Sequence, residues 1–247
     1  MTLAGDDLTR VSLILEQAGA EALAFFNRLA ARQVDTKAPG DFVSDADRAV
    51  EVTLRRLLAR DFPDCDVLGE EYGGEVGPRY WAVDPIDGTS NFLSGLPFWT
   101  ISLGLMQDGQ PLLGGIIAPV MGLMAVGSPG DLRETGLSPD SRPAASPCIG
   151  IGRNPRWPLA DRHRAEALIV EAGLAPRILG SCALSLMLVA TGRLAGYVEP
   201  RVGGMWDCAG GLALCHAAGV PYRYRTHPDG TVDVAAGGVF GIVPVDW

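Results

Sequence analysis

The segment of residues 80–92 constrains this chain most, because an apolar run ends there in two carboxylates and a glycine turn. Asp84 closes the apolar run, and Asp87 stands three residues later, directly before Gly88-Thr89-Ser90. Proline cannot donate to a strand ladder, so Pro85 predicts that a strand ends at Asp84. Two carboxylates carried to one strand end are the oxygen ligands that hard divalent cations take.

The residues around these carboxylates also suit a phosphate group. The Ile86 carbonyl lies between the two acids in the sequence and is a further oxygen ligand. Gly88-Thr89-Ser90 predicts a turn into a helix, whose free N–H groups and positive dipole end favour a phosphate oxygen. The segment therefore combines cation ligands with an anion cradle, which is what phosphoryl transfer to water requires.

Three more acidic positions follow apolar or helix-starting segments: Glu70-Glu71, Asp207 and Asp47. Each has an ordinary explanation. Asp207 could be a helix N-cap worth ~1 kcal/mol, Asp47 the acidic member of a capping box, and Glu70-Glu71 a solvated turn. Asp84 and Asp87 could likewise be Asx-turn residues. One shared site explains all of them together. Gathering four carboxylates without a cation would be destabilising or would raise their pKa values.

Composition excludes several classes of protein. The net charge of −9 argues against a nucleic-acid surface. The N-terminus lacks a basic segment, and the most apolar stretch, residues 112–127, is interrupted by glycine and proline, so neither a signal peptide nor a membrane span is expected. Five cysteines without CxxC spacing favour reduced thiols and a cytoplasmic location. Walker, EF-hand and haloacid-dehalogenase patterns are absent from the sequence.

Periodicity and turn signals predict the following elements. In the first half we expect helices over 8–32 and 44–61, short strands at 67–68, 80–83 and 100–106, and a hairpin of 113–118 with 123–126. Residues 130–147 read as an exposed loop. Beyond it, strand-like segments at 148–152, 177–180 and 196–199 alternate with helical segments at 159–172, 183–191 and 207–218. The alternation predicts a mostly parallel α/β half behind a half with helices and an antiparallel sheet.

The chain resembles the inositol monophosphatase family of Mg²⁺-dependent, lithium-sensitive phosphatases. The matching segments are Val43–Asp47, Gly69-Glu70-Glu71, Asp84–Phe92, Leu188–Gly192, Trp206–Gly210 and Ala217-Ala218-Gly219. The resemblance implies an α+β fold, a layered αβαβα sandwich of the inositol monophosphatase and fructose-1,6-bisphosphatase type. It also implies one phosphatase domain over residues 1–247, with sub-halves of about 1–135 and 136–247.

The resemblance further implies the roles of the site residues. Glu70, Asp84 and the Ile86 carbonyl would hold one Mg²⁺; Asp84, Asp87 and Asp207 would hold a second, and Glu70 could share a third. The nucleophile would be a metal-activated water oriented by Glu70 and Thr89, with Asp47 hydrogen-bonding Thr89. Gly88, Thr89 and Ser90 would bind the phosphate, and Glu199 would contact the rest of the substrate. A homodimer is also implied.

Two departures from the family pattern leave the substrate open. The segment 127–147 is shortened, and the spacing from Glu199 to Asp207 is one residue longer than expected. The expected substrate is a small phosphorylated metabolite, with inositol 1-phosphate as the default. Histidinol phosphate, a sugar bisphosphate and 3′-phosphoadenosine 5′-phosphate are alternatives. A non-catalytic, regulatory family member is a second hypothesis, against which all the ligand positions are present.

Overall fold

The protein is described by a computed structural model that covers residues 6–30, 39–136 and 145–245. Its strands form two sheets that follow one another along the chain, with strand orders β1-β2-β3-β4-β5-β6 and β10-β11-β9-β7-β8. The first sheet contains β1 Asp66–Gly69, β2 Arg79–Asp87, β3 Thr100–Gln107, β4 Gln110–Ala118, β5 Leu123–Ser128 and β6 Asp131–Thr135. The second contains β7 Cys148–Ile151, β8 Ala175–Arg177, β9 Gly196–Val202, β10 Tyr222–Thr226 and β11 Val232–Gly237.

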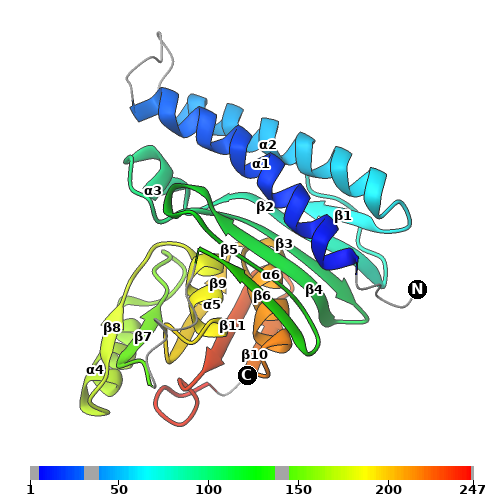
Figure 1. Ribbon diagram of the computed structural model, residues 1–247. Helices are drawn as coiled ribbons and strands as arrows, with labels where there is room; N and C mark the ends of the chain where they lie inside the picture. Colours follow the sequence, from blue (N-terminus) through cyan, green and yellow to red (C-terminus); the bar gives the residue numbers. More distant parts are fainter. Residues whose placement is uncertain (1–5, 31–38, 137–144, 246–247) are drawn as a thin grey trace.

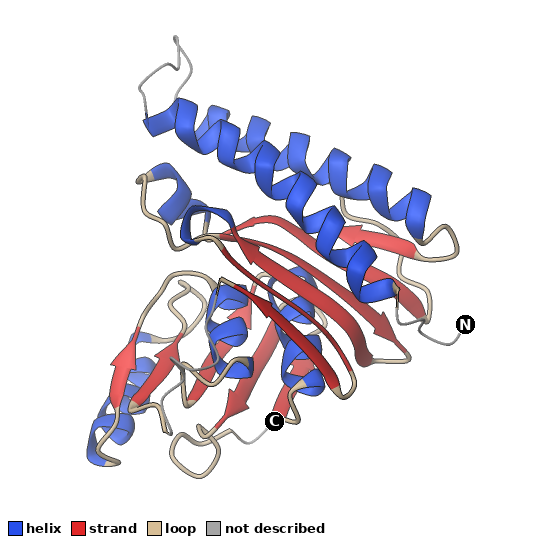
Figure 2. Ribbon diagram, viewed as in Figure 1, coloured by secondary structure: helices blue, strands red, loops and turns tan. Residues whose placement is uncertain are grey.

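Helices and sheets alternate in five layers (Figure 1). The helices are α1 Asp7–Ala30, α2 Pro39–Asp61, α3 Thr89–Leu93, α4 Leu159–Glu171, α5 Cys182–Ala190 and α6 Met205–Ala217, with a 3₁₀ turn at Pro119–Met121. The pair α1 and α2 covers the outer face of the first sheet, and α5 and α6 fill the space between the two sheets. Helix α4 lies against the second sheet (Figure 2). The expected layered αβαβα fold is confirmed.

Helix α6 packs unusually close to the first sheet because glycine lines the contact. A Cβ added to Gly104 on β3 would lie 2.4 Å from the backbone carbon of Ala209 on α6. A Cβ added to Gly210 would lie 2.5 Å from the Ser102 hydroxyl. Any side chain at these positions would push α6 away from the sheet. This close approach places Asp207, in the first turn of α6, near the end of β2.

The ends of several elements differ from the sequence expectation, and two of these differences involve prolines. Helix α2 begins at Pro39, five residues before the expected start at Ser44, because proline is well suited to a first helical turn. Strand β2 continues past Pro85 to Asp87 and is not ended by the proline. The pairing with β3 is irregular between Asp84 and Asp87, so the missing proline donor falls where the ladder is already interrupted.

Two further expectations were wrong about the second half and the loop before it. The segment expected to be a loop from 130 to 147 contains strand β6, which pairs with β5; residues 137–144 lie outside the described residues. The second sheet is mixed: β7 pairs parallel with β8 and β9, but β11 pairs antiparallel with β9 and β10. A tight turn at residues 227–230 forms the unexpected final hairpin, since antiparallel neighbours need only a short connection.

Candidate metal and catalytic site

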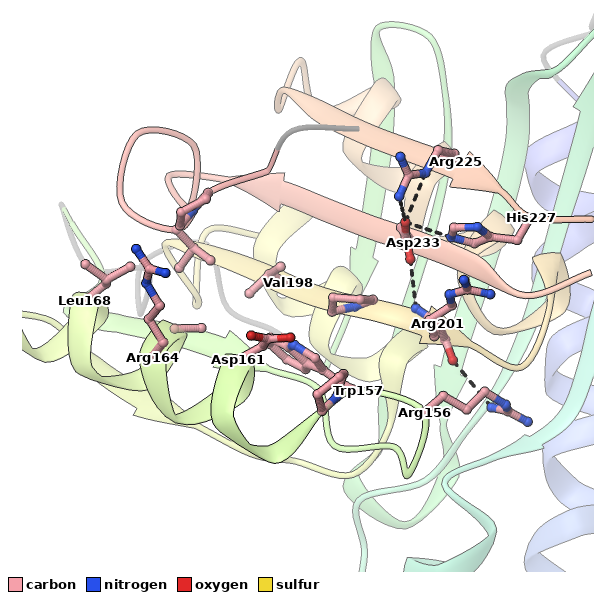
Figure 3. Close-up of a pocket in the computed structure, with 15 residues that line it drawn as sticks. Arg156, Trp157, Asp161, Arg164, Leu168, Val198, Arg201, Arg225, His227 and Asp233 are labelled. Carbon is pink, nitrogen blue, oxygen red and sulfur yellow. Dashed lines mark hydrogen bonds and ion pairs between the residues drawn. The ribbon is translucent and has the colours of Figure 1, made fainter.

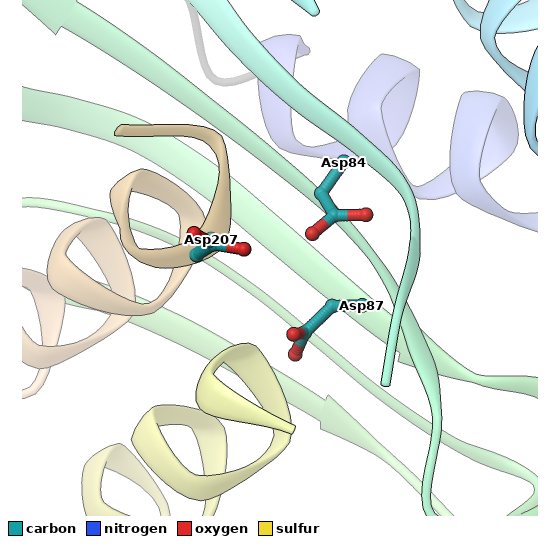
Figure 4. Close-up of side chains that lie close together, drawn as sticks. All are labelled: Asp84, Asp87 and Asp207. Atoms are coloured by element: carbon teal, nitrogen blue, oxygen red, sulfur yellow. The ribbon is translucent and has the colours of Figure 1, made fainter. Parts of the chain in front are cut away.

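Three carboxylates converge where β2 ends against the first turn of α6 (Figure 4). Oxygen atoms of Asp84, Asp87 and Asp207 lie within 4.8 Å of one another. Asp84 and Asp87 are buried and Asp207 is partly buried. The sequence therefore predicted correctly which of these residues the fold brings together.

This acidic cluster has no basic partner in the part of the chain that the structure describes, where none of its members forms an ion pair. Burial raises the pKa of Asp84 and of Asp207 well above the usual range, and repulsion from neighbouring carboxylates adds to the shift. Burial also raises the pKa of Asp87, to about 6. Buried carboxylates without a counter-charge are unfavourable, so this oxygen-only donor set fits a hard divalent cation.

Each carboxylate is oriented by backbone N–H groups. Asp84 Oδ1 accepts the Ile86 N–H at 3.0 Å, across Pro85. Asp207 Oδ2 accepts the Gly204 N–H at 2.8 Å. Asp207 is thus the third residue of α6, and its side chain bonds back to the residue before the helix. The alternative interpretation of Asp207 as the helix N-cap is therefore wrong, because Gly204 holds that position.

Asp87 is held by the N-terminus of helix α5. It accepts hydrogen bonds from the Ser181 hydroxyl, from the Cys182 N–H at 3.3 Å and from the Ala183 N–H at 2.7 Å. These bonds favour the charged form and oppose the rise in the pKa of Asp87 that burial causes. Ser181 is also the N-cap of α5, accepting the Leu184 N–H at 3.1 Å. One carboxylate therefore joins the two sequence halves at the site.

Glu70 stands beside the cluster on the turn after β1. Its side chain is exposed, and its carboxyl group interacts with that of Asp84. Desolvation at the cluster raises the pKa of Glu70 to about 7, and the neighbouring Asp87 charge adds to the rise. A carboxylate with a pKa near neutrality can accept and return a proton at physiological pH.

A buried glutamate on α2 fixes the turn that carries Glu70. Glu51 is fully buried and accepts the N–H groups of Glu71, at 2.7 Å, and Tyr72, at 3.3 Å. Arg55 bonds Glu51 at 2.7 Å and also donates to the carbonyls of Val67, at 3.2 Å, and Gly73. The sequence analysis missed this pair, whose only signal was the i,i+4 spacing of opposite charges on a helix.

Asp47 and Thr89 lie near the cluster but do not make the expected hydrogen bond with each other in the described structure. Thr89 Oγ1 donates instead to the Ile86 carbonyl at 3.3 Å. Asp47 is buried, and desolvation raises its pKa to about 8, with repulsion from Glu70 adding to the effect. The expectation of an Asp47–Thr89 bond is therefore wrong for this arrangement of the side chains.

Gly88, Thr89 and Ser90 form the turn into the short helix α3, as the sequence predicted. Gly88 is at φ 97°, a conformation that glycine adopts at little cost, and a Cβ there would lie 2.9 Å from the Phe98 carbonyl. Asn91 secures the turn by donating to the carbonyls of Phe98, at 2.7 Å, and Leu179, at 2.8 Å. The N–H groups of Asn91 and Phe92 donate to the Gly88 carbonyl, at 2.8 Å and 3.1 Å, and so close the first turn of α3.

Glu199 lies on β9, apart from the cluster but on the same pocket. The pocket has a volume of about 130 Å³, and Asp87, Glu199 and Asp207 are among its lining residues. Glu199 is buried and accepts hydrogen bonds from the Tyr197 hydroxyl and from Asn154 at 2.9 Å. Burial raises its pKa, and these bonds oppose the shift. The pocket thus has the acidic cluster at one side and Glu199 at another.

The sequence model of the inositol monophosphatase family matches residues 7–242 of this chain. The chain belongs to the inositol monophosphatase family. Its relatives include phosphoric monoester hydrolases, and the three clustered carboxylates lie on segments through which the sequence resembles this family. No helix in the described parts of the chain is long and apolar enough to cross a membrane.

Individual family members show how widely the similarity extends. An uncharacterized protein of Sinorhizobium fredii is 42% identical over 232 residues, covering 92% of this chain and 84% of that protein. An inositol-1-monophosphatase of Rhizobium meliloti is 34% identical over 218 residues, 82% of this chain and 79% of that protein. A histidinol-phosphatase of Mycobacterium tuberculosis is 43% identical over 118 residues, 47% of this chain and 45% of that protein.

The fold is shared with solved structures of the family. The inositol monophosphatase from Anabaena superposes with a TM-score of 0.71 at 25% identity, covering 94% of this chain and 90% of that one. The family fold is therefore present across nearly the whole chain.

Proposed function

We propose that this protein hydrolyses a small phosphate monoester with the help of Mg²⁺. The observation that carries the proposal is the convergence of Asp84, Asp87 and Asp207, from two separate elements, on one partly buried point without a basic partner in the described chain. Such an arrangement is unfavourable unless a cation completes it. The phosphate-binding turn at Gly88-Thr89 lies directly after Asp87 in the chain.

The proposed cation ligands divide into two overlapping sets. Glu70, Asp84 and the Ile86 carbonyl would hold one ion, and Asp84, Asp87 and Asp207 a second, with Glu70 able to share a weaker third. All are oxygen donors, as Mg²⁺ prefers. When bound, a divalent cation supplies positive charge to the phosphate oxygens and lowers the pKa of water.

The protein groups around the cluster have separate proposed tasks. Glu70 would help to orient the attacking water, whose pKa a bound cation lowers. The Thr89 hydroxyl, now 3.3 Å from the Ile86 carbonyl, would orient that water, and Asp47 would support this arrangement from α2. The N–H groups of Gly88 and Thr89, with Ser90 beside them, would bind the phosphate.

Glu199 would select the substrate's leaving group. Its carboxylate lies on the pocket that also contains Asp87 and Asp207, and it suits hydroxyl groups or an amine equally well. Inositol 1-phosphate is the first candidate. Histidinol phosphate is the second, and the identity of 43% to a histidinol-phosphatase over 118 residues supports it. A sugar bisphosphate and 3′-phosphoadenosine 5′-phosphate remain alternatives of the same chemical class.

We also propose that the enzyme is a cytoplasmic homodimer, as the family resemblance implies. The five cysteines are all free thiols, in keeping with a reducing compartment. Light scattering of the purified protein at several concentrations tests the dimer, and a monomer at every concentration would contradict it.

The experiment is phosphate release from four esters, with Mg²⁺ and with a chelator. The four are inositol 1-phosphate, histidinol phosphate, fructose 1,6-bisphosphate and 3′-phosphoadenosine 5′-phosphate. Mg²⁺-dependent turnover of one ester, lost in Asp84→Asn and kept in the exposed control Asp64→Asn, supports the proposal. No turnover of any ester, in protein shown to bind Mg²⁺, would favour the regulatory hypothesis.

A further inference from the structure

A second and larger pocket lies between helix α4 and the second sheet, away from the acidic cluster (Figure 3). We call it the α4 pocket; Trp157, Arg164 and Val198 are among the residues that line it. Its volume is about 650 Å³, within the roughly 300–1,000 Å³ typical of small-molecule sites. None of the residues assigned above to the cation or the phosphate lines it.

The α4 pocket is basic although the chain as a whole is acidic. Its walls contain four arginines (Arg156, Arg164, Arg201 and Arg225) and His227. Only two carboxylates, Asp161 and Asp233, line the same space. With neutral histidine, this gives an excess of two positive charges in a protein whose formal net charge is −9. Concentrated positive charge at a pocket favours an anionic ligand.

Asp233 organises one side of this pocket. It is buried, pairs with Arg225 at 2.7 Å, lies 2.8 Å from His227 Nε2, and accepts the Arg201 N–H at 3.0 Å. The Arg201 guanidinium pairs separately with Asp229 at 3.0 Å. The carboxylate of Asp233 is therefore already fully engaged by its own neighbours.

Arg164 has no such acidic partner, whereas the charge of Arg156 acts on the buried Glu199 and opposes the rise that burial causes in the pKa of that carboxyl group. In the described residues neither forms an ion pair, and Arg156 Nη1 donates only to the Arg201 carbonyl at 3.4 Å. Arg164 projects from α4 at one end of the pocket and Arg156 lies at the other (Figure 3). An uncommitted guanidinium carries several donors in a planar fork that matches phosphate and carboxylate groups.

The remaining wall is apolar. Trp157, which is 7% exposed, lines the pocket with Val198 and Leu168. A tryptophan face and aliphatic side chains beside cationic groups suit a ligand with an apolar ring and an anionic substituent. A purely inorganic anion would leave this wall unused.

Strand β9 contains a β-bulge beside this pocket. Glu199 pairs with Val234, and Val202 pairs with Val232. Between these two pairs β9 advances by three residues and β11 by two, so β9 has one additional residue relative to β11. The additional residue is accommodated by a β-bulge in which Arg201 adopts φ 61°. A non-glycine residue in this conformation is strained, and such strain is concentrated at functional positions.

We propose that the α4 pocket binds a small organic anion with an apolar ring, and that this anion is bound without being hydrolysed. Arg164 would hold the anionic group and Trp157 would contact the ring. Hydrolysis is not expected there because the acidic cluster lies outside this pocket. The proposal is independent of which ester the acidic cluster acts on.

The test is titration with phenylphosphonate, whose carbon–phosphorus bond a phosphatase does not cleave. Calorimetry is done in a chelator, because the metal-free carboxylates repel anions from the acidic cluster. We expect one phenylphosphonate per chain, an affinity about tenfold lower in Arg164→Gln, and weaker binding of inorganic phosphate. Arg60→Gln is the matched control, since it removes the same charge from an exposed site on α2.

Two tryptophans report where the probe binds. Trp157 lines the α4 pocket, whereas Trp206 precedes Asp207 at the acidic cluster. In ¹⁵N NMR spectra we expect phenylphosphonate to move the Trp157 indole signal, assigned with Trp157→Phe, and to leave the Trp206 signal in place. Absence of binding, an equal loss in Arg60→Gln, or movement of the Trp206 signal alone would overturn the proposal.

Discussion

The carboxylate of Glu51 on α2 accepts the backbone N–H of Glu71 at 2.7 Å, and this bond ties the first helix pair to the turn that carries Glu70. The contact is so close that a Cβ on Gly69 would lie 2.0 Å from Glu51 Oε1. Glu51 itself is fully buried and charge-paired with Arg55. The position of a proposed cation ligand thus depends on a residue that does not touch the cation.

Glu51→Ala is expected to destabilise the protein and weaken Mg²⁺ binding. The variant leaves the Arg55 guanidinium and two backbone N–H groups without their acceptor, which costs about 2–4 kcal/mol. The freed turn would also hold Glu70 less firmly, so Mg²⁺ affinity should fall about tenfold or more. Urea unfolding in a chelator and calorimetric Mg²⁺ titration measure the two effects.

The matched control for this prediction is Glu75→Ala, which removes an exposed glutamate near the same turn. It should change neither quantity. Unchanged Mg²⁺ affinity in a folded Glu51→Ala protein would show that the turn keeps its shape without Glu51.

Asp87→Asn and Asp87→Ala should separate catalysis from stability. Both remove the charge, so both are expected to lower kcat/KM by about 100-fold or more. Asn retains an oxygen that can accept the Ala183 N–H, now bonded at 2.7 Å, whereas Ala leaves the start of α5 without this acceptor. Asp87→Ala should therefore be less stable than Asp87→Asn by about 1–3 kcal/mol. Thermal unfolding without metal compares them, and equal stabilities would contradict the capping role.

The metal-free protein should lose stability as pH rises from about 4 to about 8. Unfolded carboxyl groups release their protons near pH 4, whereas burial raises the pKa of Asp47 to about 8 and of Asp87 to about 6. Over this window the folded state binds more protons than the unfolded state, so the free energy of unfolding falls as pH rises. Saturating Mg²⁺ should flatten the curve. Melting temperature against pH, with Mg²⁺ and with chelator, measures this, and two parallel curves would contradict it.

Gly104→Ala should disrupt the packing that brings Asp207 to Asp84. The added Cβ would lie 2.4 Å from backbone atoms of α6, which cannot rotate away as a side chain can. We expect a loss of about 2–3 kcal/mol, as for overpacking of a rigid interior. Gly19→Ala is the comparison, because its nearest neighbour is a side-chain methyl of Ile117 at 3.1 Å. Chemical denaturation of both variants tests this, and equal stabilities would show that α6 can shift.

Local sequence predicted the acidic cluster because its members stand at element ends with distinctive neighbours. Asp84, Asp87 and Asp207 each close or follow an apolar segment, and the fold does bring them together. The sequence did not predict the roles of Glu51 and Ser181. A single charged residue within a helix and a serine before an apolar helix have common local explanations, and nothing nearby shows that they bond residues 20 and 94 positions away.

From the sequence alone, periodicity predicted the helices and short motifs predicted the clustered carboxylates. The resemblance of those motifs to a known family implied the family and the layered fold. Only the tertiary structure decided the mixed pairing of the second sheet, the extension of β2 through Pro85 and the bonding of Thr89 to Ile86. It also decided that β9 has a bulge at Arg201, beside the basic α4 pocket. The physical reason is that pairing register, close packing and pocket charge are set by residues distant in sequence, whose contacts have no local pattern.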